Sequence, residues 1–144
     1  MSLIVIEGLD GSGKGTQSRL LFESIKNTGR DIISVSFPDY SSPSSSLVKM
    51  YLSGEFGTEA DAVNPFAASS FYAVDRYASF MKNWKKQYEG GSIILADRYT
   101  TSNIVFQLSK MEEKNWDAFI RWVEDFEYTK LGLPKPDLVI YADM

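Results

Sequence analysis

The chain has 144 residues, 44% of them hydrophobic and 24% charged, and it carries a formal net charge of −4. This length and apolar content fit one globular domain spanning residues 1–144 and are too short for two. The lack of cysteine excludes disulfide frameworks and thiolate metal sites, and the lack of histidine excludes imidazole as an acid, base or ligand. The negative charge argues against a nucleic acid polymer as a partner. No stretch has the pattern of a signal peptide or a membrane span, so we expect a cytoplasmic protein with no membrane contact.

The first predicted element is a buried strand over residues 3–6, which leads into the glycine-rich stretch Gly8-x-x-x-x-Gly13-Lys14 and then into a helical pattern. Strand, loop and helix in this order are typical of a phosphate-binding loop. The glycines let successive backbone N–H groups point at phosphate oxygens, and Lys14 adds a positive charge. The predicted contacts with nucleotide phosphates are Gly8, Gly11, Ser12, Gly13, Lys14, Gly15 and Thr16.

One position departs from the strict loop motif, because Gly15 stands where a Ser or Thr normally offers its hydroxyl to Mg²⁺. The next hydroxyl belongs to Thr16. The variant Gly-Ser-Gly-Lys-Gly-Thr-Gln over residues 11–17 resembles the loop of adenylate kinases. This resemblance suggests a nucleoside monophosphate kinase that holds Mg²⁺ largely through water and phosphate oxygens.

A second strand is predicted after the loop helix. The helix is expected to close at Gly29, and an apolar strand over residues 32–37 follows and stops at Pro38. Two strands joined by a crossover helix imply a parallel pair in a right-handed βαβ unit. A polar, serine-rich loop over residues 39–46 then leads into a short helix over residues 47–52.

Asn64 and Pro65 form the next helix start, with Asn as the N-cap and Pro at the first helical position. The helical pattern runs to about residue 88. Its first half, residues 66–74, is apolar nearly all round, so we expect it to be buried on several sides. The remaining pattern predicts a strand, two helices and a last strand over residues 92–96, 101–109, 115–130 and 138–141. The expected fold class is α/β, a three-layer α/β/α arrangement of P-loop NTPase type with a parallel sheet.

Charged residues follow the third strand at Asp97 and Arg98, where open parallel sheets bind their ligands. Asp97 suits a position near Mg²⁺, although an acid there also suits a cap for the next helix. Arg98 fits a bidentate phosphate clamp, and Lys14, Asp97 and Arg98 are the catalytic candidates. Tyr72 and Arg76 lie four residues apart and share a helix face, either around a ligand or as a surface cation–π pair.

These residues together resemble the thymidylate kinase family, whose members phosphorylate dTMP. The resemblance rests on Glu-Gly-Leu-Asp-Gly-x-Gly-Lys-x-Thr-Gln at 7–17, Phe-Pro at 37–38, Phe-Tyr-Ala-x-x-Arg at 71–76, Asp-Arg-Tyr-x-x-Ser-Asn at 97–103 and Pro-Asp-Leu at 136–138. The Asp-Arg-Tyr stretch combined with this loop is its most specific part. Adenylate kinase is the alternative family, but the Asp-Gly-(Phe/Tyr)-Pro-Arg stretch that follows its third strand is absent here.

The resemblance implies an ATP:dTMP phosphotransferase that uses Mg²⁺ with ATP. It implies that Asp10 binds the 3′-hydroxyl of dTMP, that Tyr72 stacks on thymine and that Arg76 reads the thymine edge. Asn103 is then a second base contact, and Phe106 packs on the deoxyribose. The implied dTMP contacts are Asp10, Phe37, Pro38, Tyr72, Arg76, Arg98, Ser102, Asn103 and Phe106, and the implied metal contacts are Asp97 and Thr16.

Two positions differ from some family members. Tyr40 stands where they have an arginine for the acceptor phosphate, and Gly11 stands where they carry a catalytic arginine. Members without that catalytic arginine are expected to supply it from a lid that follows the fourth strand. The resemblance places the lid, the final strand and the adenine-contacting segment after residue 144, so we expect a C-terminally incomplete domain that binds dTMP but forms little dTDP.

Two other classes of function stay open. One is a non-catalytic fragment that binds phosphate or dTMP without turnover, and the other is a GTPase-like switch. Arg76, Arg98 and Asn103 disfavour the switch, because they suit an acceptor nucleotide. The resemblance further suggests a homodimer that binds small-molecule nucleotides.

Overall fold

Two units, each interrupted in sequence by the other, make up the computed structural model, which describes residues 1–8 and 13–142. Unit 1 contains Met1–Phe37, Phe80–Tyr99 and Pro134–Met144, and unit 2 contains Pro38–Ser79 and Thr100–Leu133. Over the described residues, no helix combines the length and the apolar character that a membrane crossing requires.

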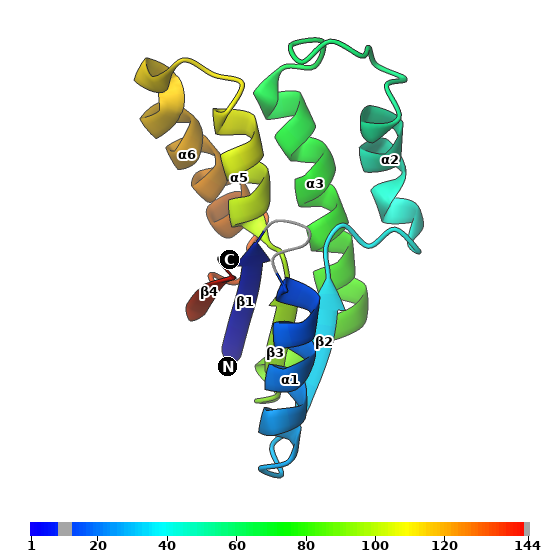
Figure 1. The fold of residues 1–144 in the computed structure, drawn as a ribbon, viewed down its shortest axis with the longest axis vertical. Coiled ribbons are helices and arrows are strands. Elements are labelled where there is room, and N and C mark those ends of the chain that lie inside the picture. Colours follow the sequence, from blue (N-terminus) through cyan, green and yellow to red (C-terminus); the bar gives the residue numbers. More distant parts are fainter. Residues whose placement is uncertain (9–12, 143–144) are drawn as a thin grey trace. The chain divides into compact units, whose positions relative to one another are not determined.

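Unit 1 is built on a four-stranded parallel sheet in the order β2-β3-β1-β4 (Figure 1). The strands are β1 (Ser2–Gly8), β2 (Ile32–Ser36), β3 (Ile93–Asp97) and β4 (Leu138–Ala142). The first four residues of β3 are buried, as expected for an interior strand of a parallel sheet covered on both faces. The α/β class and the parallel sheet predicted from the sequence are therefore confirmed.

The predicted pairing of the first two strands is wrong. β1 pairs with β3 and β4, and among the described strands β2 pairs only with β3, so β3 lies between the two strands that the first crossover joins. A crossover helix fixes the parallel direction of two strands but leaves room for a third strand between them. The sequence pattern predicted the parallel direction of β1 and β2 correctly, but it carried no signal for the strand that lies between them.

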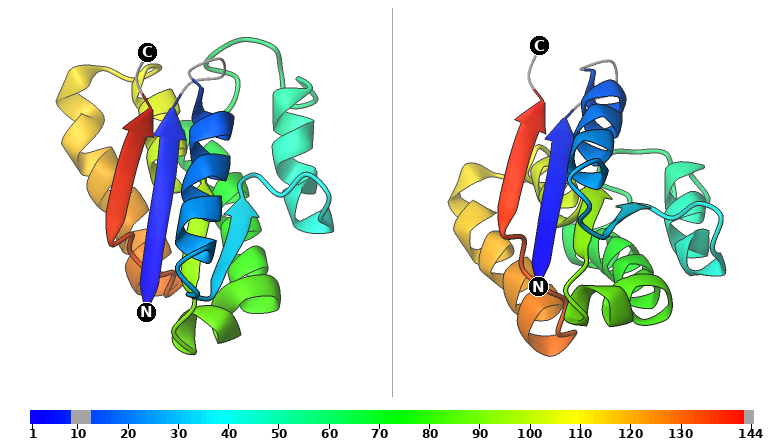
Figure 2. Two further views of the ribbon diagram at one scale, coloured as in Figure 1. Left: turned by 60° about the horizontal axis from the view of Figure 1, so that its bottom comes forward. Right: turned by 90° about the horizontal axis from the view of Figure 1, so that it is seen from below.

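Helices of unit 1 pack on this sheet. Helix α1 (Lys14–Lys26) contacts β1, β2 and β3 and lies over one face of the sheet (Figure 2). Gly29, with φ of 87°, follows its C-terminal end, as predicted. A π-helical segment, η2 (Phe80–Trp84), and α4 (Lys85–Glu89) precede β3. The fully buried Trp84 in η2 packs its ring against Phe37 and Tyr99.

Unit 2 is helical. Its elements are η1 (Pro43–Ser45), α2 (Ser46–Leu52), α3 (Pro65–Ser79), α5 (Thr100–Leu108), η3 (Glu113–Asn115), α6 (Trp116–Glu124) and the π-helical segment η4 (Asp125–Lys130). α3 contacts α2, α5 and α6. The predicted start of α3 is confirmed, because the Asn64 side chain accepts a hydrogen bond of 2.9 Å from the backbone N–H of Ala67.

The expected burial of residues 66–74 on several sides is wrong at two positions. Phe66 remains 43% exposed and Val74 41% exposed, whereas Ala68 and Ala73 are fully buried. Small residues let neighbouring elements approach one face of α3. Phe66 makes T-shaped ring contacts with Phe119 and Trp122, and part of its surface remains open.

Candidate functional site

The N-terminal end of α1 has the properties of an anion-binding site. Gly13 precedes the helix with φ of 84°, a left-handed conformation that glycine adopts without strain. The first turn contains no acidic residue, and no side chain of the described residues caps it. Backbone N–H groups at this end and the partial positive charge of the helix therefore favour a phosphate group.

Lys14, the first residue of α1, forms an ion pair with Asp97 at the carboxyl end of β3. The Lys14 side chain is 11% exposed and that of Asp97 is 31% exposed. The two candidate residues thus meet at the carboxyl end of β3, where open parallel sheets bind their ligands. An ammonium group and a carboxylate in this position supply one charge for phosphate oxygens and one oxygen ligand for a cation.

The backbone at Arg98 is held in an uncommon conformation by the end of β1. Arg98 is the only described non-glycine residue with positive φ, at 67°. Its N–H donates to the carbonyl of Ile6 at 2.9 Å, and the N–H of Tyr99 donates to Oε1 of the buried Glu7 at 2.9 Å. Tyr99 also donates its hydroxyl to the carbonyl of Pro134. Left-handed backbone in a side-chain-bearing residue costs about 1–3 kcal/mol and is concentrated at functional sites.

In unit 2, Arg76 of α3 forms a two-point ion pair with Glu127 of η4. Arg76 Nε lies 2.6 Å from Glu127 Oε1, and its Nη2 lies 2.7 Å from Oε2. Both side chains are buried, at 2% and 1% exposure. Two parallel charged hydrogen bonds fix the plane of the guanidinium group.

A second buried polar group lies on α3 and α5. Asn103 donates from Nδ2 to Ser69 Oγ at 2.9 Å and accepts from Gln107 Nε2 at 3.2 Å. All three side chains are buried, and Gln107 Oε1 has no partner among the described residues. Amide groups held in this way present fixed donors and acceptors rather than mobile ones.

Aromatic side chains complete the candidate residues of unit 2. The half-buried Tyr72 ring meets the Tyr51 ring edge-on at 6.3 Å, and Phe106 is 46% exposed with Lys110 Nζ 4.3 Å above its ring. Tyr40, at the position where some relatives have an arginine, is 51% exposed.

The predicted site residues divide between the two units. Unit 1 holds Gly8, Gly13, Lys14, Gly15, Thr16, Phe37, Asp97 and Arg98, and unit 2 holds Pro38, Tyr72, Arg76, Ser102, Asn103 and Phe106. Asp10, Gly11 and Ser12 lie outside the described residues. Phe37 is 4% exposed and packs in the core of unit 1.

Sequence reasoning missed three buried acids, Glu7, Asp75 and Glu127. Glu127 continues the helical spacing of the buried Phe119 and Val123, so an acid on an otherwise apolar face was the available signal. Glu7 ends an apolar strand, and nothing in the pattern distinguishes it from a solvent-facing acid.

Groups of three or more Asp, Glu, His or Cys side chains that could hold a metal are absent from the described part of the chain. A cation at this site would therefore depend on few protein ligands. Asp97 offers a partly exposed carboxylate, and Thr16 offers a hydroxyl from the first turn of α1. One or two oxygen ligands, completed by water and substrate phosphates, suit Mg²⁺.

A family model and similar known proteins agree on one family for this chain. The family model described as "Thymidylate kinase" matches residues 6–144. A thymidylate kinase of Mycobacterium tuberculosis is 33% identical over 136 residues, covering 94% of this chain and 62% of that protein. One from Caenorhabditis elegans is 31% identical over 153 residues, with 99% and 62% covered. The chain thus spans about 62% of the length of these curated relatives.

Solved structures of thymidylate kinases are also similar to this chain. A thymidylate kinase from Candida albicans superposes with a TM-score of 0.71 at 27% identity, covering 98% of this chain and 62% of that chain. One from Ehrlichia chaffeensis gives a TM-score of 0.72 at 23% identity, covering 99% and 74% respectively. The second likeness is evidence for the fold alone.

Proposed function

Since the chain belongs to the thymidylate kinase family, we propose that it transfers the terminal phosphoryl group of ATP to dTMP, giving dTDP and ADP. The observation that carries the proposal is the Lys14–Asp97 pair at the start of α1, which no side chain of the described residues caps. That arrangement suits the phosphates of a nucleotide and a divalent cation. We further propose that residues 1–144 act as part of a single nucleoside monophosphate kinase domain.

The residues of unit 1 are proposed to bind the ATP phosphates. Backbone N–H groups of the loop that ends at Gly13 and of the first turn of α1 would contact the phosphate oxygens, with Gly8, Gly11, Ser12, Gly15 and Thr16 completing the loop. Lys14 would leave Asp97 and neutralise charge on the transferred group. Arg98, fixed in its turn by Glu7 and Ile6, would clamp the acceptor phosphate.

The residues of unit 2 are proposed to bind dTMP. Arg76 and Asn103 would hydrogen-bond the thymine edge, Tyr72 would stack on the base and Phe106 would pack on the sugar. The buried hydrogen bonds of Arg76 and Asn103 support this assignment, because they hold both groups in one orientation. Asp10, Phe37, Pro38 and Ser102 complete the proposed dTMP contacts.

Mg²⁺ is proposed to enter with ATP and to be held by Asp97 and Thr16. When bound, it would neutralise developing charge on the phosphate oxygens. Asp97 would exchange its bond to Lys14 for the cation, and Lys14 would then be available for phosphate. Gly15 provides no side-chain oxygen, so Thr16 is the proposed hydroxyl.

The reaction needs no imidazole base. The attacking atom is an oxygen of the dTMP phosphate, which is already anionic at neutral pH, so no proton has to be removed from it. The protein contributes orientation and charge, through Lys14, Arg98 and the backbone N–H groups at α1. A chain without histidine is compatible with this chemistry.

We also propose a homodimer in the cytoplasm, as the family resemblance suggests. Sedimentation velocity of the purified chain tests the dimer, whose expected mass is twice the 16.2 kDa of one chain. A single monomeric species at all concentrations would contradict it.

Two measurements test the activity. Calorimetric titration with dTMP, AMP and GMP reports acceptor binding, and a coupled assay of ADP release with ATP, Mg²⁺ and dTMP reports transfer. We expect dTMP to bind more tightly than AMP or GMP and ADP release to depend on dTMP. Equal binding of AMP would favour an adenylate kinase, no nucleotide-dependent heat would contradict the proposed acceptor site, and dTMP binding without ADP release would favour the non-catalytic fragment.

A further inference from the structure

The buried ion pair between Arg76 and Glu127 costs desolvation free energy in a small helical unit. Both groups are almost fully buried, and transfer of two charges from water costs free energy that their attraction often fails to recover. An apolar pair of similar volume would commonly serve stability as well or better. The pair therefore calls for a reason other than stability.

The backbone around Glu127 is also unusual. Glu127 lies in η4, where the α-helical pattern of α6 changes to a π-helical one. Such π-helical turns are rare and are frequently found at functional sites. The change of pitch falls on the segment that brings a carboxylate to Arg76.

We propose that Glu127 is a positioning residue that makes Arg76 a reader of a neutral base edge rather than a ligand for phosphate. This rests on the proposed function, in which Arg76 contacts thymine. Glu127 uses both of its oxygens on one edge of the guanidinium group, so the plane of that group is fixed. It also cancels the positive charge, which would otherwise attract the dianionic phosphate of any nucleotide.

The Lys14–Asp97 pair of unit 1 differs from this pair, and the difference supports the assignment of Arg76 to a neutral base edge. Lys14 is also paired with a carboxylate, but through a single nitrogen and with a partner that is 31% exposed. Such a pair can open for a phosphate at modest cost. The Arg76 pair is bidentate and buried, so opening it leaves an uncompensated buried charge, which is strongly unfavourable.

The test uses Glu127→Gln, which keeps the volume and removes the charge. Calorimetry with dTMP and AMP should show the dTMP affinity falling about tenfold, while the AMP affinity rises because the uncancelled charge of Arg76 attracts its phosphate. Inorganic pyrophosphate should compete with dTMP more strongly in the variant than in the parent chain. Glu124→Gln, which changes an exposed acid three residues earlier at the end of α6, is the matched control and should leave both affinities unchanged.

A purely structural role would lower the two affinities together, so an unchanged ratio of dTMP to AMP affinity would overturn the proposal. If Glu127→Gln fails to fold, Arg76→Met is compared with the double variant Arg76→Met, Glu127→Met, whose apolar pair removes both charges. Adding the Glu127 substitution should then change dTMP affinity no further, and a further loss would overturn the proposal. Failure of the parent chain to bind dTMP would instead contradict the proposed function, which keeps the two failures distinct.

Discussion

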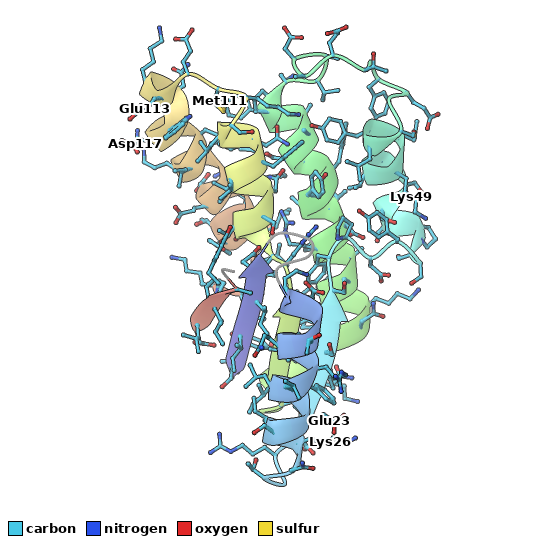
Figure 3. All side chains as sticks on the ribbon, viewed as in Figure 1. Glu23, Lys26, Lys49, Met111, Glu113 and Asp117 are labelled. Atoms are coloured by element: carbon cyan, nitrogen blue, oxygen red, sulfur yellow. The ribbon has the colours of Figure 1, made fainter. Side chains whose placement is uncertain are left out.

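The Lys14 ammonium group is paired with Asp97, so a bound phosphate competes with this carboxylate for its positive charge. We predict that Lys14→Ala weakens ATP binding and lowers turnover by roughly 10²–10³-fold, because a charge donor to the transferred group is lost. Lys26→Ala is the control: it lies at the other end of α1, near Glu23, and is exposed (Figure 3). The coupled ADP-release assay measures both, and ordinary turnover by Lys14→Ala with an intact fold would contradict the assignment of the phosphate loop.

Glu7 determines the backbone around Arg98. Its carboxylate accepts the N–H of Tyr99, directly after the residue with positive φ. We predict that Glu7→Ala lowers the free energy of unfolding by about 1–3 kcal/mol, because a buried N–H loses its acceptor. Chemical denaturation measures the change, and Glu23→Ala on the exposed face of α1 should shift it by less than about 0.5 kcal/mol. A stability equal to that of the parent chain would show that water or another group replaces the carboxylate.

At the scale of elements, η4 is tied to α5 by a hydrogen bond of 2.6 Å between the hydroxyls of Tyr128 and Thr100. Burial raises the pKa of Tyr128 above 10.0, although the Thr100 hydrogen bond opposes part of that rise. The folded chain therefore holds the phenolic proton more tightly than the unfolded chain. This contribution to stability is fully present below about pH 10 and is lost as the pH rises through the folded pKa.

We predict that Tyr128→Phe costs about 1 kcal/mol of unfolding free energy at pH 8 and that the difference from the parent shrinks above pH 10. Urea denaturation at a series of pH values measures both quantities. Tyr77→Phe, at an exposed position of α3, is the control for general effects of alkaline pH. A difference that stays constant from pH 8 to pH 11 would contradict the link between Tyr128 ionisation and folding.

Local signals allowed most elements to be predicted from the sequence. Asn64 and Pro65 marked the start of α3 because capping depends on neighbouring residues alone. The two π-helical segments were missed, since they continue a helical pattern and differ only in pitch. The neighbours of β1 were missed because strand order depends on contacts between distant residues.

The site residues likewise divide into those that local sequence signals placed correctly and those whose contacts involve distant residues. The meeting of Lys14 and Asp97 was predictable, because the carboxyl ends of parallel strands share one edge of a sheet. The partner of Arg76 was not predictable, because Glu127 is 51 residues away and lies in a π-helical turn. Spacing within one helix suggested Tyr72 as a neighbour of Arg76, and the ion pair with Glu127 comes from a different element.

At the scale of the whole molecule, β4 is exposed on both of its faces. Leu138, Val139, Ile140 and Tyr141 are each 37–58% exposed, and β4 pairs only with β1 among the described strands. An apolar strand with an unpaired edge favours association with other strands. We predict that the purified chain forms assemblies larger than a dimer at high concentration.

Val139→Lys should suppress those assemblies, because a charged side chain on an edge strand opposes strand addition. Leu52→Lys, at a similarly exposed apolar position of α2, should leave them unchanged. Sedimentation velocity at several concentrations measures the outcome. Equal effects of the two substitutions would assign the association to general surface hydrophobicity instead of to β4.

The strand order also affects when β1 can pair with its neighbours during synthesis. β1 is made first, yet Ile4 pairs with Leu95 and Leu138, which lie in β3 and β4. At synthesis rates of about 5–20 residues per second, β4 follows β1 by on the order of ten seconds. Until β3 has been made, the apolar run over residues 3–6 has no partner strand, so during translation this part of the sheet is open to aggregation or to binding by a chaperone.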